Sequence, residues 1–365
     1  MTIKSFLKFI YKYRHQAIAI VFSVYALCLR LLKLTNHTLW ADELLQLRTL
    51  DKPFIKMIKS LPQIDFNSYL NGDHILIYPF FKIFSFNKWG LAIPHILVTI
   101  LGFWFLYMIS KRYFKTTWGY TITFCIICFN ATLINHATEI RPYAVLPTLA
   151  LGCFYFSEKL INQNVAMKIQ KKMAIGIFFI ATIWFHLYGI AITSAVILFY
   201  LLTKISDKNF KTIFKHSAKF YLIILFVTIP LWLISVFGAH PTYQPYGADT
   251  TFTWIADPSK NFVNFLKGVF GNLVGFKPLY PLLAGTFLPF LIPHENRLKQ
   301  ISLLFIMVFL PMGAILLADI KTTYPFIQRQ FIWVMPFFAL FLGWSWDSSI
   351  FYVNQRLSSK SSKTN

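Results

Sequence analysis

Charged residues are scarce in this sequence, and acidic residues are the scarcest of them. Only 13% of the 365 residues are charged, with 13 Asp and Glu against 35 Lys and Arg. A soluble domain of this length carries about 25% charged residues, so the shortage excludes a water-soluble globular fold. The net charge of +22 would suit a nucleic-acid partner. That class is excluded too, because the basic residues lie between apolar runs rather than on one interleaved face.

Cysteine is also scarce, and its placement argues against a redox or metal site. The four cysteines, Cys28, Cys125, Cys128 and Cys153, all fall inside apolar segments. Cys125 and Cys128 have the spacing of a metal-binding or redox pair, but no nearby residue completes a set of ligands. We therefore expect buried, inert thiols.

Long apolar runs, by contrast, recur along the whole chain. Hydrophobic residues make up 56% of the sequence and aromatic residues 19%. Each run has about 20 residues, which is enough to cross a hydrocarbon core about 30 Å thick. The basic start of the chain leads into the first run without a small-residue cleavage site, so we expect an uncleaved first helix. The predicted spans are residues 15–34, 90–110, 117–135, 143–158, 173–187, 188–203, 220–238, 278–293, 301–318 and 327–346.

The predicted fold class is therefore an all-α polytopic membrane protein with about ten transmembrane helices. Residues 75–86 and 261–275 are apolar but short, and we expect them to lie in the membrane interface or to re-enter it. The largest outer loop, residues 35–89, is expected to form juxtamembrane helices. We expect one transmembrane domain at residues 1–350, followed by a basic cytoplasmic tail at 351–365.

The distribution of charge predicts the orientation of the chain. Alternate connecting segments hold most of the Lys and Arg, so the positive-inside rule puts them and both termini in the cytoplasm. Most of the acidic residues lie in the opposite loops. We therefore expect a multi-pass protein of the plasma or inner membrane, with its active site at the extracytoplasmic face.

Four outer loops, far apart in the sequence, bring polar residues to that face. Ionisable groups at the ends of spans are costly unless they are paired or line a wet cavity. Acids, histidines and two arginines at one face suit an anion-binding cavity able to do acid/base chemistry. The residues are Asp42, Glu43, Asp73 and His74 in the first loop, His136, Glu139, Arg141 and Tyr143 in the second, His186 and Tyr188 in the third, and Tyr324, Gln328 and Arg329 in the last.

At these residues the chain resembles the GT-C superfamily of membrane glycosyltransferases. More narrowly, it is similar to the bacterial branch related to protein O-mannosyltransferases and lipid A aminoarabinose transferases. The family's paired prolines are absent at residues 75–76, which affects the expected geometry of the first loop. The elements that carry the resemblance, in the family's order, are Asp42 with Glu43, residues 73–78, residues 139–143, residues 185–188, and Arg329 ahead of Pro336.

The resemblance implies transfer of a sugar from a polyprenyl-phosphate donor to an extracytoplasmic acceptor, with inversion. It implies Asp42 as the base that deprotonates the acceptor hydroxyl, with Glu43 as its orienting partner. Cations aimed at the leaving phosphate stabilise the transition state, and Arg141 suits this role because guanidinium binds phosphate bidentately. Arg329 and His186 are further phosphate-binding candidates. The substrate-binding candidates are Asp73, His74, Tyr78, Glu139, Tyr143 and Tyr188.

The expected partners are the lipid bilayer, the polyprenyl-phosphate sugar donor and a glycan, lipid or protein acceptor, with no nucleic acid. The nearer relatives need no cofactor, although some GT-C branches use a divalent metal, and the oligomeric state is not predicted. The alternative functions are a lipid-linked saccharide flippase or transporter, an O-antigen ligase or polymerase-like enzyme, and a non-catalytic assembly protein. The sequence shows no internal repeat of the kind typical of transporters.

Each candidate residue also has a purely structural interpretation. Asp42 is of a type favoured as a helix N-cap. Glu139 and Arg141 can form an exposed ion pair of little energetic worth. His186 can hydrogen-bond to a neighbouring helix, and Arg329 can extend its guanidinium to the membrane interface.

Overall fold

The computed structural model describes residues 3–60, 72–163, 167–186, 188–237, 262–322 and 328–361. Every element within these ranges is helical, in agreement with the predicted all-α class. The elements are α1 (Ile3–Thr35), α2 (Ala41–Leu50), α3 (Phe54–Ser60), α4 (Gly72–Phe84), α5 (Lys88–Tyr113), α6 (Thr117–Phe129), α7 (Ala131–His136), η2 (Pro142–Ala144), α8 (Leu146–Gln163), α9 (Ile169–Phe185), α10 (Tyr188–Thr203), α11 (Phe210–Phe237), α12 (Phe262–Val274), η3 (Lys277–Thr286), α13 (Leu288–Leu291), α14 (Arg297–Leu304), η4 (Phe305–Phe309), α15 (Leu310–Thr322), η5 (Gln328–Val334) and α16 (Met335–Ser361).

Several of these helices have the length and composition of membrane spans, which confirms the membrane class. One more candidate span is obtained if α12 is counted together with the segment formed by η3 and α13, although these two parts are bent by 106° relative to each other. α6 and α10 are apolar but shorter. The predicted number of ten spans is therefore not confirmed. The 4 single helices that qualify in the described ranges are Lys12–Thr35, Lys88–Tyr113, Phe210–Pro230 and Arg297–Leu317.

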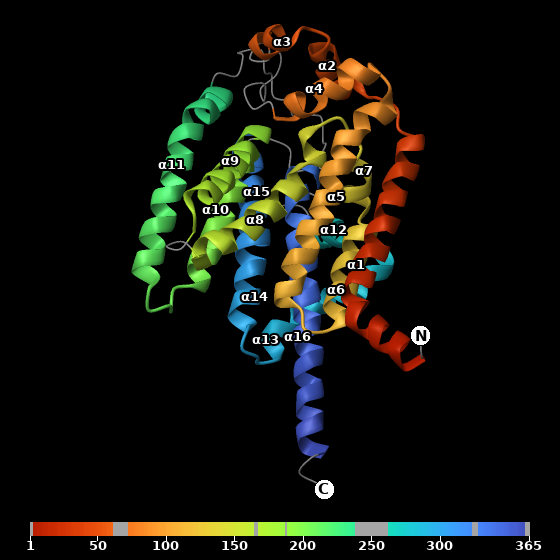
Figure 1. Cartoon of the computed structure of the whole chain (residues 1–365), viewed down its shortest axis with the longest axis vertical. Coiled ribbons are helices and arrows are strands. Elements are labelled where there is room, and N and C mark those ends of the chain that lie inside the picture. The colour runs from red at the N-terminus through yellow and green to blue at the C-terminus, as the bar shows by residue number, and fades with distance from the viewer. Residues whose placement is uncertain are drawn as a thin grey trace.

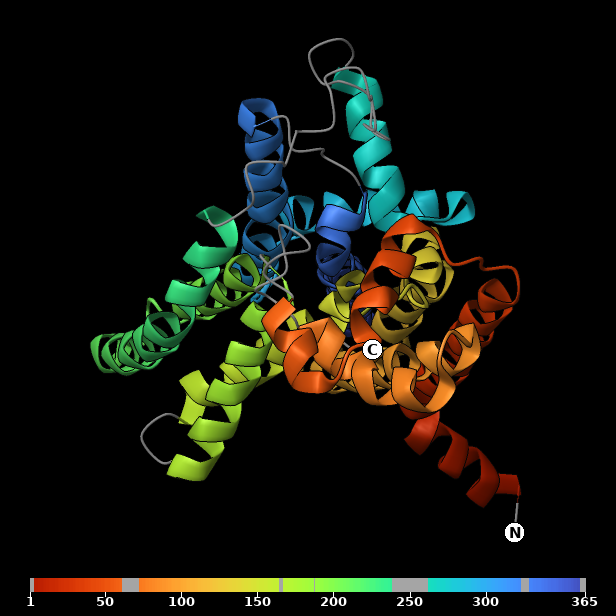
Figure 2. The same cartoon turned by 90° about the horizontal axis from the view of Figure 1, so that it is seen from above.

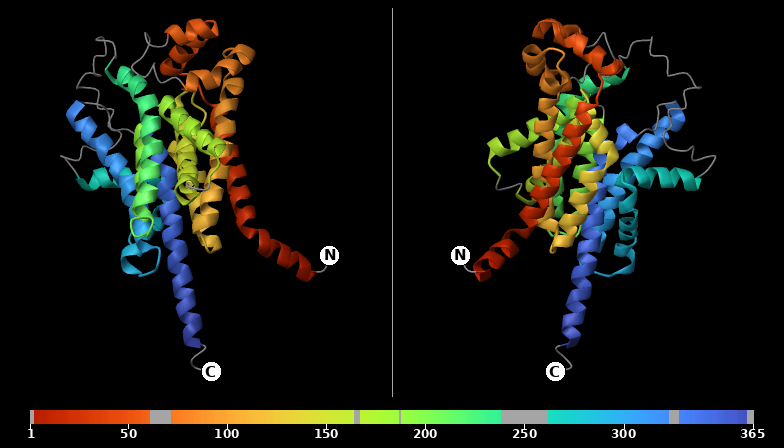
Figure 3. Two further views of the ribbon diagram at one scale, coloured as in Figure 1. Left: turned by 60° about the vertical axis from the view of Figure 1, so that its left-hand side comes forward. Right: turned by 90° about the vertical axis from the view of Figure 1, so that its right-hand side faces the viewer.

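Some of the predicted spans are interrupted in the structure. Asn130 ends α6 and caps α7, where its side-chain oxygen accepts the N–H of Leu133 at 2.9 Å, so residues 117–135 form two helices. The span predicted at 301–318 is not broken, but it contains a π-helical turn, η4. Residues 261–275 form α12 in their described part, and Figure 3 shows α12 lying across the direction of the bundle.

The helices form a bundle with α2–α4 gathered at one end. The start of α1 and the end of α16 lie at the opposite end (Figure 1). From above, α2–α4 lie over the side of the bundle that contains α5, while α9–α11 stand to one side (Figure 2). The described part of the first outer loop thus folds into short helices, as expected. α16 runs unbroken through position 350, and the division into a domain and a tail stays a prediction.

A close crossing of α6 and α16 forms the centre of the bundle. A Cβ atom at Gly343 would lie 2.0 Å from the hydroxyl oxygen of Thr123, so only glycine permits this approach. The buried carboxylate of Asp347 accepts the N–H groups of Lys115 and Thr116 at 2.7 and 2.8 Å, just before α6 begins. These contacts hold α6 against α16, whose N-terminal side continues from η5.

Candidate functional site

The acidic pair of the first loop, Asp42 and Glu43, lies in the first turn of α2, and the structure describes the side chain of Glu43. Glu43 is fully buried, and both of its oxygens are bonded. Oε1 accepts the N–H of Ile140 at 2.8 Å, and Oε2 accepts the N–H of Trp40 at 3.1 Å. His37 Nε2 lies within 3.1 Å of both oxygens. The bond to Trp40 caps α2, and the bond to Ile140 ties α2 to the second outer loop. The side chain of Asp42 lies outside the described residues.

Asp73, at the start of α4, is buried between two other helices. Its Oδ2 accepts a hydrogen bond from Gln46 of α2 at 2.5 Å, and its Oδ1 lies 2.9 Å from His95 Nε2 of α5. Burial alone would raise the pKa of Asp73, but attraction to His95 and the hydrogen bonds from His95 and Gln46 hold it below its ordinary value. Asp73 is therefore an ionised acceptor that joins α2, α4 and α5.

His74 and Arg141 are electrostatic neighbours. The pKa of His74 is lowered to about 4, chiefly by burial, while the negative charge of Asp73 opposes this shift and the positive charge of Arg141 adds to it. The imidazole is therefore neutral near pH 7. Arg141 is then the fixed positive charge at this point, and the start of α4 lies beside the turn at residues 139–143.

That turn is anchored to the first loop through Ile140. The side chain of Ile140 is 1% exposed and packs in a small apolar cluster with Leu47 of α2 and Leu91 of α5. On the side of α7, His136 Nδ1 lies 2.7 Å from Glu139 Oε2, a close contact that is not aligned as a hydrogen bond. Arg141 is thus held between a buried anchor and a 3-10 turn that begins at Pro142.

The third and fourth outer elements reach the same region through aromatic contacts. The ring of Tyr143 lies 5.3 Å from that of His186, which lies 4.7 Å from that of Tyr188. The hydroxyl of Tyr188 donates to Gln330 Oε1 at 2.5 Å, which ties the start of α10 to η5. At the start of α4, a Cβ atom on Gly72 would lie 2.3 Å from the Phe185 ring. Pairwise contacts thus link the four loops that were predicted to be outer: the turn at 139–143 contacts the first and third loops, and the third contacts the fourth.

Five of the predicted residues are not placed in this assembly by their side chains. Two of these, Tyr324 and the side chain of Gln328, lie outside the described residues. Tyr78 is directed away from it, because its hydroxyl faces the carbonyl of Lys52 at 3.4 Å and its ring packs edge-on against Phe54. The side chains of Asp42 and Arg329 lie outside the described residues. Within the described ranges, no three His, Cys, Asp or Glu side chains gather as a metal-ligand cluster.

Sequence reasoning missed four residues that hold the assembly together: His37, Gln46, His95 and Gln330. Their polar side chains contact Glu43, Asp73 or Tyr188, as described above. A signal existed for His95, since a histidine inside an apolar span needs a partner. His136, which has no motif support in the sequence, contacts Glu139.

Residues 74–234 match a family model described as dolichyl-phosphate-mannose-protein mannosyltransferase. The match supports a glycosyltransferase of the GT-C type. It includes the turn at 139–143 and residues 185–188, and it confirms the resemblance seen in the sequence. It spans fewer than half of the 365 residues and does not reach Asp42 or Glu43. No curated protein matches the chain.

Proposed function

We propose that this GT-C-type chain transfers a sugar from a polyprenyl-phosphate donor to an extracytoplasmic glycan, lipid or protein, with inversion. The observation that carries the proposal is the 2.8 Å hydrogen bond from the Ile140 N–H to Glu43. It joins the helix that bears the acidic pair to the turn that bears Arg141. A base and a phosphate-binding cation must serve one anomeric carbon, so their two backbone segments have to be fixed to each other.

In the proposed step, Asp42 accepts the proton of the acceptor hydroxyl as the hydroxyl oxygen attacks the anomeric carbon. The bond between that carbon and the donor phosphate oxygen breaks, and the phosphate leaves with the electron pair. Attack on the face opposite the phosphate inverts the configuration at this carbon. Glu43 fixes the first turn of α2, because its oxygens already accept two backbone N–H groups.

Arg141 binds the leaving phosphate in this proposal. The phosphate gains negative charge as the bond breaks, so a fixed cation stabilises the transition state more than the ground state. The neutral neighbour His74 adds no second charge there and can donate a hydrogen bond. His186 and Arg329 are the further phosphate ligands, and Glu139, Tyr143 and Tyr188 contact the sugar or the acceptor.

The test is consumption of a lipid-linked donor by the purified protein in lipid. Wild type, Asp42→Asn and Arg141→Ala are incubated with the polyprenyl-phosphate sugars of the host, and donor loss is followed by mass spectrometry. We expect wild type to consume a donor and both variants to lose nearly all of this activity. Asp51→Asn is the matched control, because this exposed acid lies just after the opposite end of α2. Full activity in the Asp42→Asn variant would overturn the assignment of the base.

The proposed orientation has its own test. Asp51→Cys and Ser359→Cys are made separately in a chain whose four cysteines are replaced by alanine, and intact cells are treated with a membrane-impermeant maleimide. Labelling is expected for the Asp51→Cys chain in intact cells and for the Ser359→Cys chain only after permeabilisation. The reverse pattern would put the candidate site on the cytoplasmic side.

A further inference from the structure

Arg30 is a buried cation in the apolar part of α1. It lies inside the span Lys12–Thr35, and only 3% of its surface is exposed. Its guanidinium carbon lies 5.6 Å from the centre of the Phe103 ring on α5. No carboxylate pairs with it among the described residues. A charge held in an apolar span without a counter-charge is costly, so such residues generally mark a functional site.

The hydrogen bonds of Arg30 leave most of its donors unused. A guanidinium has five N–H groups. One amino group donates to the carbonyl of Ala26 at 2.9 Å, and the other donates to the carbonyl of Ile127 at 3.4 Å. The Nε–H has no partner in the described part of the chain. Both accepting groups are neutral carbonyls, so no described partner of Arg30 compensates the positive charge itself.

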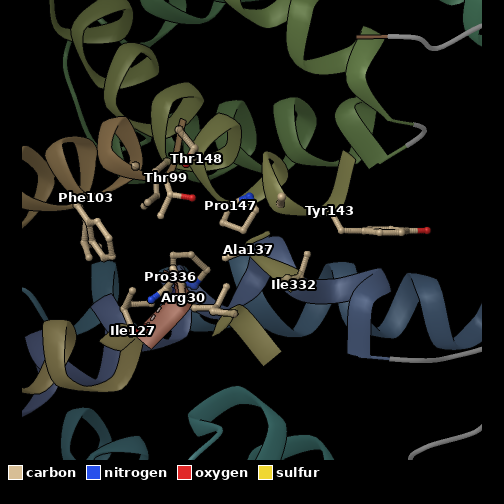
Figure 4. A pocket seen from close by; sticks show the side chains of 15 residues that line it. Arg30, Thr99, Phe103, Ile127, Ala137, Tyr143, Pro147, Thr148, Ile332 and Pro336 are labelled. Atoms are coloured by element: carbon tan, nitrogen blue, oxygen red, sulfur yellow. Dashed lines mark hydrogen bonds between the residues drawn. The ribbon is translucent and has the colours of Figure 1, made fainter. Parts of the chain in front are cut away.

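Arg30 borders a cavity of about 40 Å³ between α1, α5, α6, α8 and the start of α16. Figure 4 shows Arg30 beside Pro336 and Ile127, with Thr99, Pro147 and Thr148 on the facing wall. Tyr143 also lines the cavity, so it adjoins the candidate site. A water-sized atom needs about 10–15 Å³ by this measure. The cavity therefore has room for about three such atoms, the number of terminal oxygens on a phosphate monoester.

The remaining polar groups of the lining do not compete with Arg30 for an anion. The hydroxyl of Thr99 donates to the carbonyl of His95 at 2.8 Å, and that of Thr148 donates to the carbonyl of Val98 at 3.0 Å. Among the described residues that line the cavity, none is acidic. Apart from Tyr143, the other described lining residues are apolar.

We propose that the Arg30 cavity is a second phosphate subsite, which binds the phosphate headgroup of the isoprenoid lipid carrier beneath the candidate catalytic site. The charge of the ligand follows from the cavity, whereas the identity of the lipid rests on the proposed function. Arg30 donates to the terminal oxygens of this phosphate. Arg141 and Arg30 then bind the carrier phosphate at two different positions, on either side of Tyr143.

The experiment measures binding rather than transfer. Wild type and Arg30→Gln are placed in nanodiscs of phosphatidylcholine and titrated with radiolabelled polyprenyl monophosphate, and with polyprenol as the uncharged probe. Loss of a hydrogen bond to a charged group corresponds to roughly tenfold in affinity. We expect Arg30→Gln to weaken binding of the phosphate at least that much and to leave binding of polyprenol unchanged. Arg356→Gln is the matched control, since Arg356 is exposed near the far end of α16, and it should bind as wild type does.

A second variant keeps the test decisive if Arg30→Gln folds poorly, as judged by its melting temperature. Ala137→Leu adds side-chain volume to the cavity and leaves Arg30 in place, and it should cause a similar loss of affinity.

Unchanged affinity in both variants would overturn the inference. Displacement of the carrier by equal concentrations of phosphatidylglycerol or inorganic phosphate would overturn its assignment to the carrier lipid. If binding depends on Arg30 but no donor is consumed, this inference stands and the proposed function is refuted. If a donor is consumed but binding does not depend on Arg30, the proposed function stands and this inference is overturned.

Discussion

Replacing Glu43 by glutamine tests whether the acidic pair is tied to the Arg141 turn as the structure indicates. Each oxygen of Glu43 accepts one backbone N–H, from Ile140 at 2.8 Å and from Trp40 at 3.1 Å. An amide has one acceptor oxygen, so its NH₂ group must face one of these N–H donors. One charge-assisted hydrogen bond, worth about 1.5–3 kcal/mol, is lost, and a buried donor is left unsatisfied. We expect Glu43→Gln to destabilise the protein by about 3 kcal/mol in total.

The assay is thermal melting of the purified protein, together with hydrogen–deuterium exchange of the segment that contains Ile140. The variant should melt at a lower temperature, and exchange at this segment should be faster. Glu295→Gln is the control, because the Glu295 side chain is 76% exposed and its contact with Lys115 is expected to contribute less than about 1 kcal/mol. Wild-type melting and wild-type exchange in Glu43→Gln would refute the tie between α2 and the turn.

Three further predictions follow from single residues. His74 has a pKa of about 4 in the fold, whereas a histidine in the unfolded chain has a pKa of about 6.5. The folded protein should therefore lose about 3 kcal/mol of stability as the pH falls from about 6.5 to about 4, and His74→Gln should flatten this pH dependence of the melting temperature. Gly343→Ala should destabilise the protein by about 1–3 kcal/mol through overpacking. Gly313→Ala should leave the melting temperature unchanged, because the space around Gly313 is open. Tyr188→Phe should lower the free energy of unfolding by about 1 kcal/mol, because it removes the hydrogen bond to Gln330, and it should raise the KM for the donor.

The helical class and the meeting of the outer loops were accessible from the sequence because both depend on patterns that survive without coordinates. Apolar length predicts spans, and charge asymmetry predicts which loops share a face. The structure accordingly brings residues 139–143 beside α2 and α4, and Tyr143 beside His186. The breaks within spans were less accessible. Asn130 looks like a glycosylation-type asparagine in the sequence, but in the fold it caps α7 and contacts the carbonyls of α12.

The partners of the motif acids were not accessible, because they depend on packing between helices that are distant in sequence. Asp73 matches the motif only as an acid next to His74. In the fold it accepts from Gln46, which lies 27 positions earlier, and contacts His95 on the next helix. Nothing in the local pattern identifies a glutamine in α2 as its donor. Arg30 is a similar case, since no periodicity in the sequence indicates that its guanidinium borders a cavity.

Because Glu43 and Asp73 are both motif residues and buried structural acceptors, loss of activity alone does not identify the catalytic acid. A substitution that breaks a buried hydrogen bond lowers activity by loosening α2 or α4 and lowers the melting temperature as well. A substitution that removes only the base lowers the rate of the chemical step and leaves the fold intact. Asp42→Asn should therefore reduce kcat at an unchanged melting temperature, whereas Glu43→Gln should reduce both. Equal losses of melting temperature in the two variants would mean that Asp42 serves the fold in the way that Glu43 does, and the base would then have to be sought elsewhere in the outer loops.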